Sequence, residues 1–293
     1  MSASRAKYDR LIQDLRSELR PQREWGEGRG VFLIIGHFVV GVAAGTWLFG
    51  LVFALREALA LAFALAAAGG AFHLAFLGRP ARALNMIRRV KTSWISRGFV
   101  GLSLFLVGAP LYLLTEAQAG YVLALAGMLV MMGYMGFVYT ASKGIPFWST
   151  PLHPVLYIAY ALRGGIAGVL LALAVSGREA SDPRLILGLW ILLTAAVAVL
   201  FVIELHGALT GGSAAARSSA HALLAGRLAL YFYGGTLVIG LVVPALFVWA
   251  GYAGRLSLGA MAAIGVASAL GDFFMKYSTI RAGVHLPVWL SRA

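Results

Sequence analysis

The stretch VFLIIGHFVVGVAAGTWLFGLVFAL, residues 31–55, decides the fold class of this chain. It contains no Asp, Glu, Lys or Arg, and about 20 apolar residues are enough for a helix to cross the hydrocarbon core of a bilayer. Arg56 and Glu57 interrupt the apolar run, and a second stretch of the same kind covers residues 57–78. The spacing predicts two membrane-spanning helices that are joined by a tight hairpin.

Six more windows of this kind follow, so we expect an all-α integral membrane protein with eight spans. The predicted spans are residues 31–55, 57–78, 97–115, 119–141, 152–176, 184–206, 226–250 and 257–277. The composition agrees, because 12% of the 293 residues are charged, whereas soluble domains carry about 25% charged residues. We therefore attribute the net charge of +13 to membrane orientation and expect no nucleic-acid partner.

The positive charges are distributed unequally between the two sides of the predicted spans. Nineteen of the 24 Lys and Arg residues fall on the side that carries both termini, and four fall on the other side. Such a bias marks the cytoplasmic side. We expect a multi-pass protein of a bacterial or archaeal cytoplasmic membrane, with both termini cytoplasmic and residues 31–293 forming the eight-span membrane domain.

Residues 1–30 are predicted to form a separate cytoplasmic segment. Pro21 ends a pattern of apolar residues at helical spacing, which are Tyr8, Leu11, Ile12, Leu15 and Leu19. An amphipathic helix that is rich in Lys and Arg is typical of the membrane interface, where lipid is its partner. Docking of a soluble partner is the alternative interpretation of this segment.

The polar groups inside the predicted spans lie mainly in the membrane half next to the basic side. An Arg, Lys or Asp at the bilayer centre costs roughly 2.5–3.5 kcal/mol, so such groups indicate function or paired contacts. This half holds His37, His73, Tyr134, Tyr139, Lys143, Glu204, His206, Asp272 and Lys276, while Arg163 lies deepest. The asymmetry predicts a half-depth pocket for a lipid-soluble ligand with a polar head, because a transport path is polar across the whole bilayer.

Several of these residues also have a purely structural interpretation. Asp272 and Lys276 are four residues apart, which favours mutual neutralisation on one helix. Glu204 is either solvated at the end of a span or functional. Tyr139 belongs either to an interfacial aromatic belt or to the pocket.

The histidines and the absence of cysteine limit the cofactors that this chain can hold. His37 shares a helix face with Gly41 and Gly45, so this face is expected to point inward, with a hydrogen-bonded core histidine as the alternative. We expect His153, His221 and His285 in loops. A chain without cysteine holds no iron–sulfur cluster. Because all six histidines fall near one face, we expect no haem, since two haems in series would need histidines at both faces. We also assign no metal site and no catalytic residue to this chain.

Two regions of the sequence resemble a known family. The first joins His73-Leu-Ala-Phe-Leu-Gly-Arg-Pro80 to Thr92-Ser-Trp-Ile-Ser-Arg-Gly98. The second joins Tyr134-Met-Gly136 to Lys143-Gly-Ile-Pro-Phe-Trp-Ser-Thr-Pro-Leu-His-Pro154. This pattern resembles the NrfD/PsrC/DmsC family of quinone-reactive membrane anchors, which serve molybdopterin oxidoreductases, and the resemblance covers all eight spans.

The resemblance implies two four-helix bundles and a quinone site, for ubiquinone or menaquinone, close to the face where an iron–sulfur subunit docks. It implies that His37 and Tyr134 contact the quinone and that His73 lies at the same site. Arg79 and Arg97 would shape its mouth and the docking surface. The remaining candidates for the cofactor site are Ser93, Trp94 and three residues that could relay protons, Lys143, Glu204 and Asp272.

The leading hypothesis is a membrane anchor and quinone-binding subunit of a multi-subunit iron–sulfur molybdoenzyme. It would pass electrons between an iron–sulfur partner and the quinone pool, would need a molybdenum or tungsten catalytic subunit, and would be inactive alone. The segment Trp25-Gly-Glu-Gly-Arg-Gly30 resembles anchors of phenylacetyl-CoA:acceptor oxidoreductase. The alternatives are a secondary transporter of a small anionic or amphipathic solute, with Arg163 as substrate anchor, and a purely structural anchor.

Overall fold

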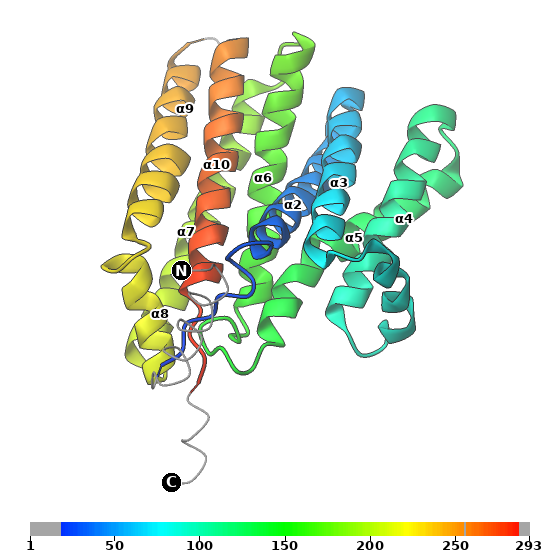
Figure 1. The fold of residues 1–293 in the computed structure, drawn as a ribbon. Helices are drawn as coiled ribbons and strands as arrows, with labels where there is room; N and C mark the ends of the chain where they lie inside the picture. Colours follow the sequence, from blue (N-terminus) through cyan, green and yellow to red (C-terminus); the bar gives the residue numbers. More distant parts are fainter. Residues whose placement is uncertain (1–18, 255, 287–293) are drawn as a thin grey trace, which may run out of the picture.

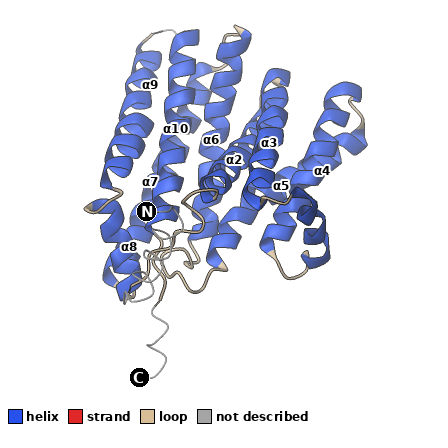
Figure 2. Ribbon diagram, in the orientation of Figure 1, coloured by secondary structure: helices blue, strands red, loops and turns tan. Residues whose placement is uncertain are grey.

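The computed structural model of the chain describes residues 19–254 and 256–286. The predicted N-terminal amphipathic helix lies almost entirely outside these residues. The described part is helical, and its only extended pairing is a single antiparallel bridge between Pro21 and Val284. Figure 2 shows helices joined by short loops, with the longer irregular segments gathered at one end of the molecule.

Eight helical stretches of the described chain are long and apolar enough to cross a membrane, which confirms the predicted number of spans. They are α2 (Gly30–Val52), α3 (Arg56–Leu77), α4 (Trp94–Thr115), α5 (Gln118–Thr140), α6 (His153–Ser176), α7 (Pro183–Thr210), η2 with α9 (Tyr231–Val242 and Val243–Ala253) and α10 (Leu258–Ala282). The hairpin between the first two spans is confirmed, because only residues 53–55 separate α2 from α3.

Side-chain caps and left-handed residues explain where several helices begin and end. Ser93, Asp182 and Ser257 each accept a hydrogen bond from the backbone N–H three residues later, at the start of α4, α7 and α10. Such caps satisfy donors that the first helical turn leaves free. Gly78 and Gly177 end α3 and α6 with positive φ values of 64° and 70°, which glycine adopts without steric cost.

Two shorter helices were not predicted from the sequence. A 3-10 helix, η1 (Pro80–Arg89), follows α3, and α8 (Ala214–Leu224) follows α7. Both lie on the side of the molecule that also holds residues 19–29, 141–152 and 283–286, and we call this side the terminal face. They escaped prediction because they are too short and too polar to match a spanning window.

Helices α2 and α6 form the interior of the helix array. They are the most buried spans, with 67% and 72% of their apolar windows inside the protein. Figure 1 shows α4 and α9 at opposite edges of the array. Helix α6 packs against α2, α3 and α5 and also against α7 and α10. Because α6 contacts helices of both expected groups, the division into two four-helix bundles stays a prediction.

Glycine contacts bring the central helices unusually close together. A Cβ atom on Gly165 of α6 would meet the backbone of Gly45 in α2, and Gly240 in η2 faces Gly271 in α10 in the same way. Small residues allow such backbone approach between membrane helices. The expected inward orientation of the face that carries His37 and Gly45 is therefore confirmed, and His37 is 3% exposed.

Candidate functional site

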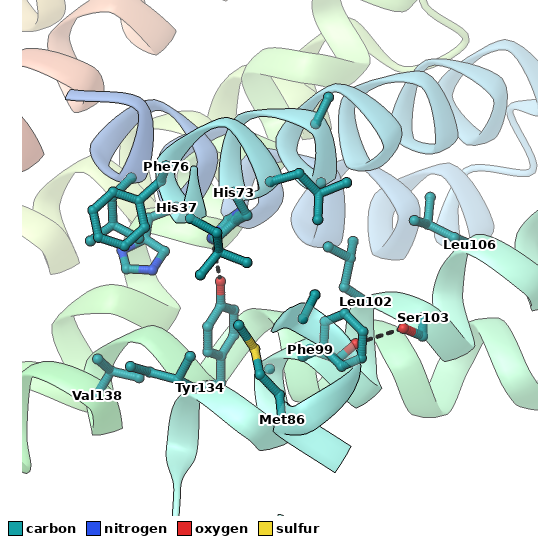
Figure 3. A pocket seen from close by; sticks show the side chains of 18 of the residues that line it. His37, His73, Phe76, Met86, Phe99, Leu102, Ser103, Leu106, Tyr134 and Val138 are labelled. Atoms are coloured by element: carbon teal, nitrogen blue, oxygen red, sulfur yellow. Dashed lines mark hydrogen bonds between the residues drawn. The ribbon is translucent and has the colours of Figure 1, made fainter. Parts of the chain in front are cut away.

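A cavity of about 500 Å³ lies between α2, α3, α4 and α5 near the terminal face. Its wall is mostly apolar and includes Leu74 and Phe76 of α3, and Phe99 and Leu102 of α4. Helix η1 contributes Met86. Figure 3 shows that His37, His73 and Tyr134 gather at one side of this cavity, whereas Leu102, Leu106 and Ser103, whose hydroxyl donates to the Phe99 carbonyl, lie at the other side.

The polar side of the cavity is formed by His37, His73 and Tyr134, which come from three different helices. The imidazole centroids of His37 and His73 are 5.1 Å apart. Nδ1 of His73 lies 2.7 Å from the Gly69 carbonyl oxygen. A carbonyl only accepts, so Nδ1 must carry the proton and Nε2 is an acceptor in the neutral ring. The Tyr134 hydroxyl therefore donates to Nε2 of His73, over 3.3 Å.

His37 is held by a second tyrosine. The Tyr139 hydroxyl lies 2.8 Å from Nδ1 of His37, and both side chains are buried. When this hydroxyl donates to Nδ1, the neutral imidazole carries its proton on Nε2. Nε2 has no hydrogen-bond partner among residues 19–254 and 256–286, so in this tautomer the ring has one free N–H group.

Trp25 closes the cavity from the segment that precedes α2. Its ring stacks on Trp148 at a centroid distance of 5.6 Å and meets Tyr139 edge-on at 5.5 Å. The segment is tied to the C-terminal end of α10 by an ion pair of 3.1 Å between Arg281 and Glu27. Sequence reasoning used Trp25 only in a motif comparison, because the contacts that place it come from distant helices.

Three of the ten predicted site residues line this cavity, namely His37, His73 and Tyr134. The other seven lie outside its wall, and they are Arg79, Ser93, Trp94, Arg97, Lys143, Glu204 and Asp272. No group of three His, Asp or Glu side chains in the described ranges is close enough to hold a metal ion. The arrangement can bind a mostly apolar molecule that has hydrogen-bonding groups at one end.

The family model for polysulphide reductase, NrfD, matches residues 29–287 of the chain. The chain belongs to the NrfD family. A curated relative, protein NrfD of Escherichia coli (strain K12), is 28% identical over 145 residues. That match covers 48% of this chain and 46% of the relative, so the chain is aligned with less than half of the relative's length.

Family membership makes this chain an NrfD-type membrane subunit, and subunits of this family are parts of oxidoreductase complexes. The match begins one residue before α2 and extends just beyond α10, so it includes all eight spans. The two histidines and Tyr134 of the cavity therefore lie within the part of the chain that the family model matches, whereas Trp25 precedes it.

Three predicted site residues of this NrfD family member lie around the first turn of α4. Ser93 caps the helix, and the Trp94 ring stacks on Phe137 of α5 at 4.2 Å. The Arg97 guanidinium lies 4.2 Å from the centre of the Trp94 ring. Trp94, Arg97 and Phe137 line a separate cavity of about 410 Å³, which has Tyr134 in its wall as well, whereas Ser93 lies outside it.

Glu204 occupies a buried polar cluster instead of a solvated position. It is 3% exposed, and its Oε1 atom accepts from Thr150 at 2.8 Å and lies 2.6 Å from Nδ1 of His153. The expectation of His153 in a loop is wrong, because this residue begins α6 and is fully buried. His221 also lies in a helix, α8, whereas His285 lies in a non-helical segment as expected.

Asp272 pairs with a different residue from the one that the sequence favoured. It accepts from Nη1 of Arg163 on α6, whereas Lys276 lies 3.4 Å from the backbone carbonyl oxygen of His37. The direct ion pair of Asp272 is therefore with Arg163 of another helix, while Lys276 lies near enough for an electrostatic interaction with Asp272. Arg163 also donates to the Gly240 carbonyl at 2.6 Å, and Pro244, four residues later, has no N–H to donate to that carbonyl.

The last two predicted site residues, Lys143 and Arg79, also lie outside the wall of the 500 Å³ cavity. Lys143 lines a third cavity of about 310 Å³ at the terminal face, together with Gln22 and His285. Trp25 lies in the walls of this cavity and of the 500 Å³ cavity, so its side chain separates them. Arg79 sits at the junction between α3 and η1 and is exposed.

Proposed function

We propose that this chain is the quinone-binding membrane subunit of a multi-subunit oxidoreductase. It would pass electrons between a partner iron–sulfur subunit and the quinone pool. The observation that carries this proposal is the mostly apolar 500 Å³ cavity in which His37, His73 and Tyr134 gather at one side. Family membership supports the same assignment.

The residues of this cavity fit a quinone. A quinone has a flat ring with two carbonyl acceptors and an apolar tail, so it needs hydrogen-bond donors at one end of an otherwise apolar space. Nε2 of His37 is a group on the polar side that has no hydrogen-bond partner within the described residues. Aliphatic and aromatic side chains of α3 and α4 surround the rest of the cavity. A bound quinone would supply two-electron, two-proton redox chemistry.

Each polar residue has a distinct role in this proposal. His37 donates from Nε2 to a ligand carbonyl while Tyr139 holds its other nitrogen. The Tyr134 hydroxyl rotates from His73 to the ligand, since its present 3.3 Å bond is longer than the usual 2.5–3.0 Å for a hydroxyl donor. His73 keeps a fixed tautomer through Gly69, so its Nε2 atom stays an acceptor that holds the Tyr134 hydroxyl while no ligand is bound.

Electrons must come from other subunits, because the chain has no cysteine to bind a cluster. We assign a molybdopterin subunit with molybdenum or tungsten and an iron–sulfur subunit as partners, and the chain alone would be inactive. The basic bias of the terminal side supports docking at the cytoplasmic face of a bacterial or archaeal membrane. The Trp25–Gly30 motif supports phenylacetyl-CoA or a related thioester as the partner's substrate.

The hydrogen bonds of Arg163 speak against the alternative hypothesis of a transporter. It needs Arg163 as a free cation, but each guanidinium nitrogen already donates, to Thr194, Asp272 and the Gly240 carbonyl. Arg163 therefore joins α6, α7, η2 and α10 in a structural contact.

The proposal is tested by purifying the tagged complex in mild detergent and by measuring bound quinone and co-purifying subunits. The variant His37→Ala should assemble normally but lose quinone binding and quinone-dependent turnover. His206→Ala is the matched control, because His206 is exposed at the end of α7. A chain that purifies without quinone and without an iron–sulfur partner, or a His37→Ala complex with unchanged quinone binding, would refute the assignment.

A further inference from the structure

The 410 Å³ cavity beside α4 and α5 is a groove on the lipid-facing side of these two helices. Its wall consists of aliphatic and aromatic residues together with Arg97. Leu129, which lies in the wall, is 60% exposed. In a membrane, side chains that are exposed on a spanning helix face lipid, so this groove is accessible from the bilayer.

A missing side chain leaves space in the groove at Gly133. A Cβ atom at this position would meet only the Phe137 ring, at an ordinary contact distance of 3.7 Å. At Gly101, by contrast, a Cβ atom would collide with Val130, because α4 and α5 are in close contact there. Gly133 therefore opens the groove toward lipid, whereas Gly101 closes its inner side.

Arg97 is fixed at the end of the groove next to the terminal face. Its Nε and Nη2 atoms donate to the carbonyl oxygens of Val90 and Lys91, at 3.0 and 2.9 Å. The guanidinium stacks on the Trp94 ring, which reduces its freedom further. Nη1 has no partner within the described ranges, so a fixed cation with a free donor stands at the mouth of the groove.

Other cations surround this mouth, and the local sequence supplies no anion to neutralise them. Arg88, Arg89 and Lys91 are exposed on η1 and the turn that follows it. No Asp or Glu occurs between Glu57 and Glu116. A concentrated positive charge of this kind attracts a ligand that carries a negative charge.

Helix η1 indicates that this positive charge lies at the membrane surface. Leu84 and Ile87 are 68% and 56% exposed on the same short helix as the two arginines. Exposed apolar side chains next to arginines are typical of a segment that lies in the lipid headgroup region. A soluble acidic partner would leave these apolar side chains in water, whereas a lipid surface would cover them.

We propose that this groove binds one anionic phospholipid, with its phosphate on Arg97 and the neighbouring cations and with one acyl chain against Leu129 and Gly133. The groove and its cation are parts of one continuous feature, which matches a molecule that has a charged head and an apolar tail. The binding itself does not depend on the quinone assignment. Tyr134 lies in the wall of this groove and of the 500 Å³ cavity, so the lipid packs against a residue of the quinone site.

The test uses native mass spectrometry of the full chain, released from nanodiscs of phosphatidylcholine with increasing phosphatidylglycerol. The expected result is one retained phosphatidylglycerol per chain. Arg97→Ala should weaken its retention about fivefold, the effect of one cation at a membrane surface. Gly133→Leu should weaken it without a change in charge, by filling the space for the acyl chain. Arg217→Ala is the control, because Arg217 is exposed on α8 of the same face.

Three results would overturn the proposal, and each points to a different explanation. Equal retention in Gly133→Leu would mean that the groove holds no acyl chain. Full competition by inorganic phosphate or glycerol phosphate would mean that the cations bind a free anion. Displacement of the lipid by the acidic surface of a co-purified subunit would assign this face to a protein partner. Because Gly133→Leu replaces none of the residues that contact Arg97, it shows whether an acyl chain occupies the groove even if Arg97→Ala folds poorly.

Discussion

The hydrogen bond between Tyr139 and His37 offers the sharpest test of how the pocket is organised. The substitution Tyr139→Phe removes only the hydroxyl group, which lies 2.8 Å from Nδ1 of His37. It leaves Nδ1 buried without its partner, and a buried unsatisfied group costs about 1–3 kcal/mol. It also removes the contact that holds the proton of His37 on Nε2, the atom that faces the cavity.

Two effects are expected from Tyr139→Phe. The free energy of unfolding should fall by about 1–3 kcal/mol, and quinone affinity should fall about tenfold, which corresponds to roughly 1.4 kcal/mol at 25 °C. The matched control is Tyr157→Phe. Tyr157 is also buried and packs against Tyr139 at 5.3 Å, but its hydroxyl has no hydrogen-bond partner within the described residues. Removal of that hydroxyl should therefore have little effect.

Both variants can be compared in lipid nanodiscs, by thermal unfolding and by titration with a short-chain quinone whose binding quenches tryptophan fluorescence. The reasoning is refuted if Tyr139→Phe and Tyr157→Phe give the same melting temperature and the same quinone affinity. Loss of quinone binding in Tyr157→Phe alone would also refute it, because the ligand would then bind next to Tyr157 and not next to His37.

Three further predictions concern groups outside the main cavity. Asp272→Ala should destabilise the fold by about 3–5 kcal/mol, because Arg163 would be left as a buried charge without a counter-ion. Lys276→Met should lower the free energy of unfolding much less in the same assay. A larger loss in Lys276→Met than in Asp272→Ala would mean that Lys276, and not Arg163, is the main partner of Asp272. Glu204→Ala should lower the melting temperature more than Glu204→Gln, since glutamine keeps an acceptor oxygen for the buried partners. If both variants lower the melting temperature equally, the cluster depends on the negative charge of Glu204 and not on its acceptor oxygen. Burial, with a smaller contribution from Arg20, lowers the pKa of His285. The unfolded state therefore binds a proton more readily, and stability should decrease as pH falls below about 6.5. The measurement is the dependence of the free energy of unfolding on pH, which His285→Gln should reduce.

The spans could be predicted because composition alone determines them, but their ends depend on polar residues. Helix α4 begins at Trp94, before the predicted residue 97, since Ser93 caps it and Arg97 is accommodated on the Trp94 ring. The predicted span begins with Arg97 itself, whose side chain can reach the headgroup region from a first turn, and it leaves out the three residues that the cap adds to the helix. Helices η1 and α8 could not be predicted in this way either, because they are not apolar enough to match a spanning window.

The site could be predicted only as far as depth in the membrane determines it. His37, His73 and Tyr134 share one level of the bilayer, and three neighbouring helices bring them together. Asp272 was assigned to Lys276 because the two are neighbours on one helix, but its partner, Arg163, lies 109 residues away in the sequence. Contacts of this range depend on helix packing, which a single sequence does not reveal.

The close contact between α2 and α6 has a consequence for the order in which the protein is made. Gly45 leaves the ribosome 120 residues before Gly165, so the first hairpin enters the bilayer long before the helix that fits against it. During that interval the glycine face of α2 is covered by lipid or by another helix. The wall that carries His37 therefore reaches its final packing only after α6 has been inserted, and correct biogenesis requires displacement of whatever first covers that face.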